Sequence, residues 1–397
     1  MEDLQHDALR EIIRHLPCVA DRDDAADVCR KWRAALEVPL PDPKPPRQLP
    51  WLLLPSAGST RACCLICGTG KDVCAIRHKL LATHGARLFG SYNGGWLFLA
   101  RDHIRRHALV NIRAVLPNKN ARFLDLPDAL APSLHHGRRD MVILAATLSS
   151  SPNEHNCIGA GIVMQWELIA GQRQMAFWRM GDSVAMPLDT EDICQSSLEV
   201  EDVLYHDGSF HFLTQGAHIR KCTPLFNQSG GLESISSSVQ LFQYKECNHP
   251  VMARYLVHSR GLLLMVVRSG SQYSGSPTRD FKVYKMTDKQ VIKDGFSKIE
   301  YTWSELESLD GLVLVAGRGC SRSYEVAEYV GRGLDEGVYF ADDGAFHDSA
   351  MLLRGIHDRK YMCSDNGLWS EWGGPKVRRC FPVQGPSKNS GPVWLLP

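Results

Sequence analysis

A proline-dense stretch divides the chain and limits what it can fold into. Six of the twelve residues from position 39 to position 50 are prolines. Proline fixes its own φ, has no backbone N–H and disfavours helix in the preceding residue, so residues 39–49 are predicted to form a stiff, extended linker. The hydrophobic period differs on the two sides of this linker, which predicts two domains, over residues 1–38 and residues 50–397.

The segment before the linker has the hydrophobic period of α-helices. Two apolar faces, separated by Pro17 and Asp21, each have residues at i, i+3, i+4 and i+7. The first face consists of Leu9, Ile12, Ile13 and Leu16, and the second consists of Ala25, Val28, Cys29 and Trp32. We expect Pro17 to end the first helix and Asp21 to cap the second.

This helical segment is too small to be stable by itself. Domains of about 40 residues bury little surface and usually need a metal, disulfides or a partner. The apolar side chains here outnumber those that two or three short helices can hide, so we expect some of them to be covered by another surface. That surface is either a partner protein, which the stiff linker favours, or the chain's own second domain.

The region after the linker has the pattern of short strands joined by tight turns. The segment from Tyr205 to Phe212 places Asp207-Gly208, a favoured type I′ turn pair, between two apolar stretches. Gly208, Gly261 and Gly311 follow one another at intervals of 53 and 50 residues, each before an apolar stretch. Such spacing is typical of four-stranded propeller blades, and it predicts about seven blades, or fewer with long loops. A β-sandwich with a second β-domain is the competing architecture.

The two ends of this β-region have similar sequences. Residues 50–55 read PWLLLP, and residues 392–397 read PVWLLP. Propellers often complete one blade with strands from both ends, because closure removes exposed sheet edges. We therefore expect the two segments to lie in one blade, with coincidence between two short apolar strands as the alternative.

Composition excludes several classes of protein. Hydrophobic residues make up 44% of the chain and charged residues 22%, as in ordinary globular proteins. With 45 basic and 44 acidic residues, the chain has no charge excess that would attract nucleic acid or an anionic membrane. The apolar run from Gly261 to Val267 is far shorter than the roughly 20 residues that span a bilayer. We expect a cytoplasmic or nuclear protein without nucleic-acid or membrane partners.

One cysteine cluster resembles part of a metal site. A Cys-x₂-Cys pair is half of a tetrahedral zinc site. The candidate ligands are Cys64, Cys67, Cys74 and His78. The gap between the pair and Cys74 is short for a zinc finger, and the intervening Leu65-Ile66 fits the core of a strand. Buried thiols are therefore the favoured interpretation, zinc is the alternative, and we expect no cofactor.

Catalytic motifs are not evident in the sequence. The glycine-rich segment 317–323 contains Arg318 and Arg322 and could hold an anion, but it follows an apolar strand, so a polar turn at a blade edge is favoured. A propeller enzyme or sugar-binding module would need converging carboxylates or a metal. We expect a protein that is not itself an enzyme.

The segment from Leu4 to Ala35 resembles the F-box motif. The resemblance rests on Leu16-Pro17 and on the closing VCRKWR of residues 28–33, whereas Gln5 stands where proline is usual. It implies a small helical domain that binds a Skp-type adapter. The implied contact residues are Leu4, Leu9, Ile12, Ile13, Leu16 and Pro17. The residues implied to pack the helices together are Val28, Cys29 and Trp32.

Landmarks in the rest of the chain resemble the plant F-box proteins with a KIB-type β-propeller. These landmarks are the segments 50–55, 94–97, 176–182, 303–317, 337–340 and 393–394. The implied architecture is an α+β multidomain protein, with a small N-terminal helical F-box followed by an all-β propeller-like domain. The implied function is the substrate receptor of an SCF-type (Skp–cullin–F-box) ubiquitin ligase, in which the adapter connects the chain to a cullin and the propeller binds an unidentified protein substrate. A scaffold or ligand-binding module without a role in ubiquitin transfer is the alternative.

Overall fold

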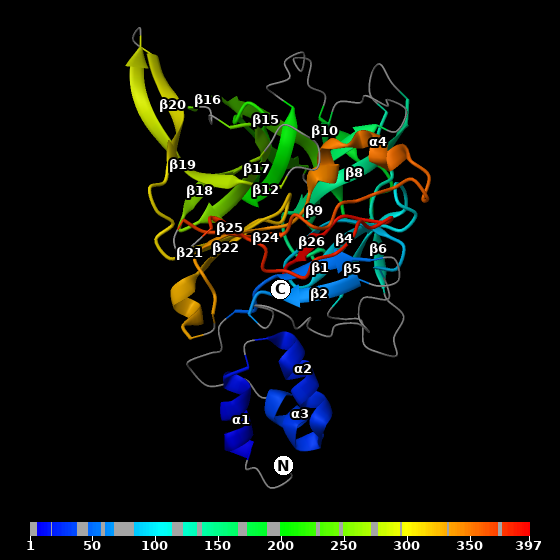
Figure 1. Ribbon diagram of the computed structural model, residues 1–397. Coiled ribbons are helices and arrows are strands. Elements are labelled where there is room, and N and C mark those ends of the chain that lie inside the picture. The colour runs from blue at the N-terminus through cyan, green and yellow to red at the C-terminus, as the bar shows by residue number, and fades with distance from the viewer. Residues whose placement is uncertain are drawn as a thin grey trace.

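The fold was analysed in a computed structural model of the chain. The residues that the structure describes are 6–16, 18–37, 47–56, 60–66, 83–112, 122–132, 137–165, 173–188, 199–227, 231–245, 249–270, 277–293, 296–331, 333–371 and 375–397. Most of the predicted linker therefore lies outside the described residues. Figure 1 shows a small helical unit at one end of a larger β-region.

The helical unit contains three short helices, α1 (His6–Arg14), α2 (Val19–Val28) and α3 (Arg30–Glu37). The predicted second helix is therefore two helices, because the backbone of Cys29 is extended (φ −165°, ψ 173°) and interrupts it. The cap also differs from the prediction. Cys18 occupies the N-cap of α2, and Asp21 lies in its first turn, where a negative charge favours the helix dipole. No described helix has the length and apolar content needed to cross a bilayer.

Strands in the described part of the chain form six sheets, which are the blades of a six-bladed propeller. Blade 1 contains β1 (Trp51–Pro55), β2 (Thr60–Cys64) and β26 (Val393–Leu395). Blade 2 contains β3 (Arg87–Tyr92), β4 (Trp96–Ala100), β5 (His107–Asn111) and β6 (Phe123–Asp125). Blade 3 contains β7 (Ala129–Leu130), β8 (Arg139–Leu148), β9 (Ile158–Gln165), β10 (Gln174–Arg179) and β11 (Met186–Pro187).

The second half of the ring is built in the same way. Blade 4 contains β12 (Val200–His206), β13 (Ser209–Thr214), β14 (Ile219–Phe226) and β15 (Leu232–Gln240). Blade 5 contains β16 (Phe242–Gln243), β17 (Val251–Ser259), β18 (Leu262–Ser269), β19 (Asp280–Lys293) and β20 (Phe296–Glu305). Blade 6 contains β21 (Leu312–Ala316), β22 (Arg322–Glu325), β23 (Gly337–Phe340), β24 (Gly367–Trp369) and β25 (Val377–Arg378). Short helical turns are η3 (Val326–Tyr329), η4 (Gly344–His347) and α4 (Ser349–Leu353).

The propeller prediction is confirmed, but the number of blades is six rather than about seven. Long connections account for the difference. In blade 6, residues 341–366 separate β23 from β24 and contain η4 and α4. A count of residues per blade cannot distinguish such a connection from strands.

Strands from both ends of the β-region complete blade 1, as predicted. β1 pairs antiparallel with β26, placing Trp51 opposite Leu395, Leu52 opposite Trp394 and Leu53 opposite Val393. On its other side β1 pairs with β2. Both edges of β1 are therefore paired, and the ring closes between sequence-distant segments.

The predicted type I′ turn is also present. Asp207 (φ 47°) and Gly208 (φ 71°) both have positive φ and connect β12 to β13, with His206 opposite Ser209. Because glycine adopts this conformation without steric cost, the turn sets the register of the hairpin.

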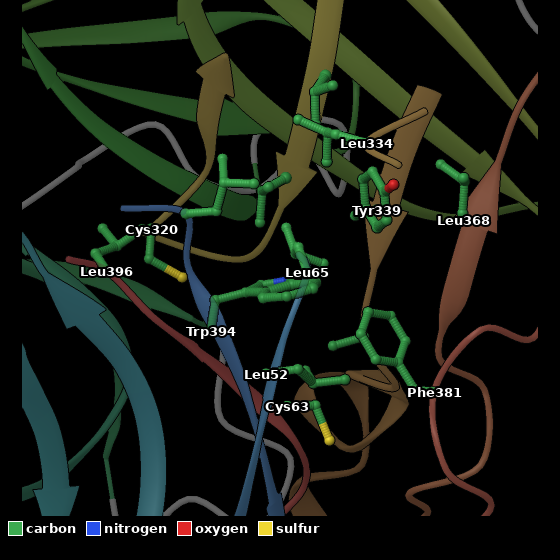
Figure 2. Close-up of a cluster of buried hydrophobic side chains, with 14 of the residues drawn as sticks. Leu52, Cys63, Leu65, Cys320, Leu334, Tyr339, Leu368, Phe381, Trp394 and Leu396 are labelled. Atoms are coloured by element: carbon green, nitrogen blue, oxygen red, sulfur yellow. The ribbon is translucent and has the colours of Figure 1, made fainter. Parts of the chain in front are cut away.

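Hydrophobic cores lie between adjacent blades. The inner strands β26, β3, β8, β12, β17 and β22 pack against one another in this order. Between blades 6 and 1, the buried side chain of Trp394 lies beside Leu52 and Cys320 (Figure 2). Its Nε1 donates a hydrogen bond of 2.9 Å to the carbonyl of Ala316 in β21. This tryptophan therefore connects blade 1 to blade 6, where the ring closes.

Candidate functional site

The helical unit has a small core of its own. Leu9, Ile13 and Trp32 are buried together, with Ala25 and Ala35, between the three helices. Leu9 and Ile13 were expected among the contacts to a partner. In this structure they are at most 1% exposed, because their face of α1 packs on α3. These two side chains therefore hold the helices together and are not available to another protein.

Other apolar side chains of the helical unit reach the surface. Ile12 is 40% exposed and Val28 is 52% exposed, while Leu16 and Cys29 are half-buried at the edge of the core. The expectation that Val28 packs the helices together is not met, because Val28 lies in the last turn of α2, on the side facing away from the core. Leu4 and Pro17 lie outside the described residues.

The helical unit touches the propeller through Cys18. This side chain is fully buried and belongs to the same apolar cluster as Trp51 and Leu53 of β1 and Cys64 of β2. One end of α2 is thus covered by the chain itself, whereas Ile12 and Val28 remain exposed. The sequence left open whether the chain's own β-region or a partner protein covers the helical unit. Cys18 packs against the β-region, and the exposed Ile12 and Val28 form an apolar patch that a partner could cover.

Among the candidate zinc ligands, only Cys64 lies within the described residues. Cys67, Cys74 and His78 lie outside them. Cys64 is buried in β2, and its Sγ accepts a hydrogen bond of 3.4 Å from the backbone N–H of Ile66. Burial raises the pKa of its neighbour Cys63 to about 11, which disfavours the thiolate that binds metals.

A buried polar cluster joins blades 5 and 6, and we call it the Arg268 cluster. It consists of Arg268, Tyr255, Thr278, Asp343 and Asp365. Arg268 of β18 is 2% exposed and donates hydrogen bonds to Asp343 (2.9 Å) and Asp365 (2.6 Å). Burial alone would lower the pKa of Arg268, but the neighbouring Tyr255 and the two carboxylates more than offset this effect, so its pKa is raised. The cluster is a buried network in which both carboxylates form ion pairs with Arg268.

The turn from Gly317 to Cys320 reaches the centre of the ring. Gly319 has a positive φ (70°), and a Cβ at this position would lie 2.4 Å from the carbonyl oxygen of Ala146 in β8. Only glycine permits this approach of blade 6 to blade 3. The expectation of a polar turn at a blade edge is therefore wrong for Arg318, which is 7% exposed and donates to the carbonyl of Glu201 (2.5 Å).

Sequence reasoning considered Arg318 as part of a turn that could hold an anion, but it missed the partners of Arg318 at the centre of the ring. Arg318 also contacts His347 (3.0 Å between Nη2 and Nε2) and lies 3.8 Å from the ring centre of Phe346. The sequence contained one signal for these buried polar residues, which is an acidic pair within or directly after an apolar strand. The pairs are Glu201-Asp202 and Asp342-Asp343. Their carboxylates accept hydrogen bonds from arginines and backbone N–H groups, an arrangement that connects blades.

The hairpin formed by β19 and β20 extends beyond the propeller body. Figure 1 shows it projecting at the end opposite to the helical unit. Near its tip, Ile292 is 78% exposed and Ile299 is 48% exposed. At its base, Lys282 forms an ion pair with Glu305 (2.7 Å) that connects the two strands. The hairpin is therefore a second apolar surface, well separated from the first.

The sequence matches a known protein family. The family model described as the KIB1-4 beta-propeller matches residues 67–364, which is most of the chain. The matched segment runs from the end of blade 1 into blade 6. No curated protein matches the sequence.

Proposed function

The chain belongs to the KIB1-4 β-propeller family, and we propose that it is the non-catalytic substrate receptor of an SCF-type ubiquitin ligase. In this proposal the helical unit is an F-box that binds a Skp-type adapter and, through it, a cullin. The propeller binds a protein substrate. Catalysis is supplied elsewhere in the assembly, so this chain contributes proximity and orientation.

The observation that carries the proposal is the surface of the helical unit. Its sequence resembles an F-box, and its three helices leave Ile12 and Val28 exposed after Leu9 and Ile13 have filled the core. An exposed apolar patch on so small a unit is typical of a protein interface. Ile12 and Leu16 are the described residues that we assign to adapter binding, and Leu4 and Pro17 stay predictions from the resemblance.

The arrangement of the two apolar surfaces also supports the proposal. The helical unit and the β19–β20 hairpin lie at opposite ends of the molecule (Figure 1). A receptor must hold its substrate without blocking its adapter, and surfaces at opposite ends meet this requirement. We assign substrate contact to the hairpin face that carries Ile292 and Ile299.

Substitution of Ile12 tests the adapter interface. Because Ile12 is largely exposed, Ile12→Asp should leave the fold intact but place an unpaired charge in the contact, which is costly on desolvation. We expect the Kd for a Skp-type adapter to rise at least about tenfold, equivalent to about 1.4 kcal/mol. Isothermal titration calorimetry with the full chain measures this.

Ile292→Asp is the matched control, since it introduces the same charge at an exposed isoleucine on the opposite surface. It should leave the adapter Kd unchanged. Equal adapter binding by wild type and Ile12→Asp would refute the assigned interface. A chain that binds the adapter but does not promote substrate ubiquitination in a reconstituted assay would instead be a scaffold, the alternative that Gln5 in place of proline leaves open.

A further inference from the structure

The β19–β20 hairpin, which projects from the propeller body in Figure 1, has a free strand edge. β18 pairs with β19 only as far as Lys285, and β16 pairs with β20 only at Tyr301 and Thr302. Among the described strands, none pairs with the outer side of residues 286–292 in β19 or of residues 297–300 in β20. An unpaired edge presents backbone N–H and C=O groups to which an extended segment of another protein can add as a strand. The free edge of β19 is the longer of the two.

One face of the hairpin is basic. Side chains alternate along a strand, and residues directly opposite each other on two strands share a face. The charged side chains described on this face, which we call the basic face, are Lys285, Lys289, Lys298 and Glu300. Three lysines and one glutamate give it a net charge of +2. Within the described part of the chain, Lys282 has a carboxylate partner, whereas the three lysines of the basic face have none.

The opposite face of the hairpin is apolar towards the tip. It carries Ile292 and Ile299, which are 78% and 48% exposed. Asp288 lies on the same face, opposite Tyr301. A carboxylate of a partner would be repelled by Asp288 on this face and attracted by the lysines on the basic face. The hairpin therefore favours apolar side chains on one face of an added strand and acidic side chains on the other.

We propose that the free edge of β19 binds an extended segment of the substrate in which acidic and apolar residues alternate. The backbone of this segment pairs with residues 286–292. Its acidic side chains lie on the basic face, next to Lys289, and its apolar side chains lie on the face of Ile292. A slip of one residue would place the carboxylates beside Asp288 and Ile292, so the two faces also select the register. The inference rests on the proposed receptor function for naming the segment a substrate.

Three capped peptides of equal length test the proposal on the full chain. The first alternates glutamate and valine, the second has the same composition with all glutamates before all valines, and the third alternates lysine and valine. Isothermal titration calorimetry at constant ionic strength measures binding. We expect the first peptide to bind at least about tenfold more tightly than either of the others. Equal binding of the first two would refute the alternation, equal binding of the first and third would refute the charge preference, and no binding of the first at millimolar concentration would refute the site.

Methylation of the peptide backbone distinguishes strand addition from charge attraction alone. A strand directs the N–H groups of alternate residues to opposite sides, so only one set of amides pairs with β19. The alternating glutamate–valine peptide is therefore methylated at its glutamate amides in one version and at its valine amides in another. We expect one version to lose binding and the other to keep it. Equal binding of both versions would refute strand addition.

A double variant locates the bound peptide. Lys289→Gln with Lys298→Gln removes two exposed charges of the basic face, so it should leave the fold intact and weaken binding of the alternating glutamate–valine peptide about fivefold or more. Lys360→Gln with Lys388→Gln is the matched control, because it removes two exposed lysines outside the hairpin. It should leave the peptide Kd unchanged. Equal peptide binding by the two double variants would overturn the assignment to the basic face.

The adapter experiment and the peptide experiment fail separately. Ile12→Asp lies outside the propeller and should bind the alternating peptide as wild type does. A chain that binds this peptide but no adapter would contradict the proposed function and leave the hairpin site standing. A chain that binds the adapter but not the peptide would contradict the hairpin site alone. Dimers in analytical ultracentrifugation that the peptide dissociates would instead assign the edge to a second copy of this chain.

Discussion

A single carboxylate, that of Asp202, connects three blades. Its Oδ1 accepts hydrogen bonds from the N–H groups of Val203 (2.8 Å) and Gly319 (2.7 Å), and its Oδ2 accepts one from Leu256 (2.7 Å). These donors belong to β12, the turn after β21, and β17. Burial raises the pKa of Asp202 to about 7, although the backbone donors oppose this shift. Desolvation of this carboxylate is unfavourable, but its hydrogen bonds fix the three blades relative to one another.

Substitution of Asp202 by Asn should destabilise the propeller. An amide nitrogen would replace one of the two oxygens and face either the N–H of Leu256 or the N–H groups of Val203 and Gly319, leaving at least one buried donor without an acceptor. We expect the free energy of unfolding to fall by about 2 kcal/mol, measured by urea denaturation. Asp310→Asn is the control, because Asp310 is 91% exposed and asparagine tolerates its positive φ. Equal unfolding midpoints for Asp202→Asn and wild type would contradict this role.

His103 makes the fold sensitive to acid. Burial, together with the positive charges of Arg87 and Arg359, lowers its pKa to about 3. In the unfolded chain a histidine takes up a proton below its ordinary pKa of about 6.5. The contribution of His103 to stability is therefore fully present above about pH 6.5 and is lost as the pH falls towards 3.

The variant His103→Asn should reduce this acid sensitivity, since asparagine does not titrate and tolerates the positive φ at this position. Between pH 6.5 and pH 5, wild type should lose about 2 kcal/mol more stability than the variant. Melting temperatures measured from pH 5 to pH 7.5 give the comparison, with the exposed His15→Gln as control. Parallel pH profiles for wild type and His103→Asn would rule out the assignment.

At the scale of elements, β26 is a short strand with a large structural effect. It has three residues, yet it pairs with β1 and carries Trp394 into the junction between blades 1 and 6 (Figure 2). Trp394→Ala would remove a buried ring and leave the carbonyl of Ala316 without its donor. We expect a loss of about 3–5 kcal/mol in the free energy of unfolding, measured by urea denaturation.

Trp394→Phe is the conservative comparison for this prediction, because it keeps most of the packing and loses only the hydrogen bond. Its effect should be smaller, about 1–2 kcal/mol. A Trp394→Ala variant as stable as wild type would mean that ring closure does not depend on this contact.

Elements with strong local signals were predictable from the sequence. The Asp207-Gly208 turn was predictable, because its backbone conformation depends on the two turn residues themselves. The apolar period of α1 was also predicted correctly. Leu9 and Ile13, however, were assigned to partner contact and lie in the core of the helical unit. The break at Cys29 was missed, because an apolar period of 3.6 residues continues across two helices that pack on the same core.

At the scale of the whole molecule, the ring separates the helical unit from the β19–β20 hairpin. The helical unit lies at one end and the β19–β20 hairpin at the other, with the closed propeller between them (Figure 1). Cys18 anchors the unit to blade 1 without covering Ile12. A rigid body between two apolar surfaces would hold an adapter and a substrate at a constant separation, as the proposed receptor function requires.

The sequence by itself determined the order of a helical unit, a proline-rich segment and a β-propeller, and the pairing of its two similar end segments. These features depend on residue type, local period and turn chemistry, which act over a few neighbouring residues. Tertiary structure alone decided that there are six blades, that Leu9 faces inward, and that Arg87 and Arg318 lie buried in the ring. Burial of such groups depends on partners more than 50 residues away, such as Ile143 for Arg87 and Glu201 for Arg318. Only the closed ring brings these partners within contact distance.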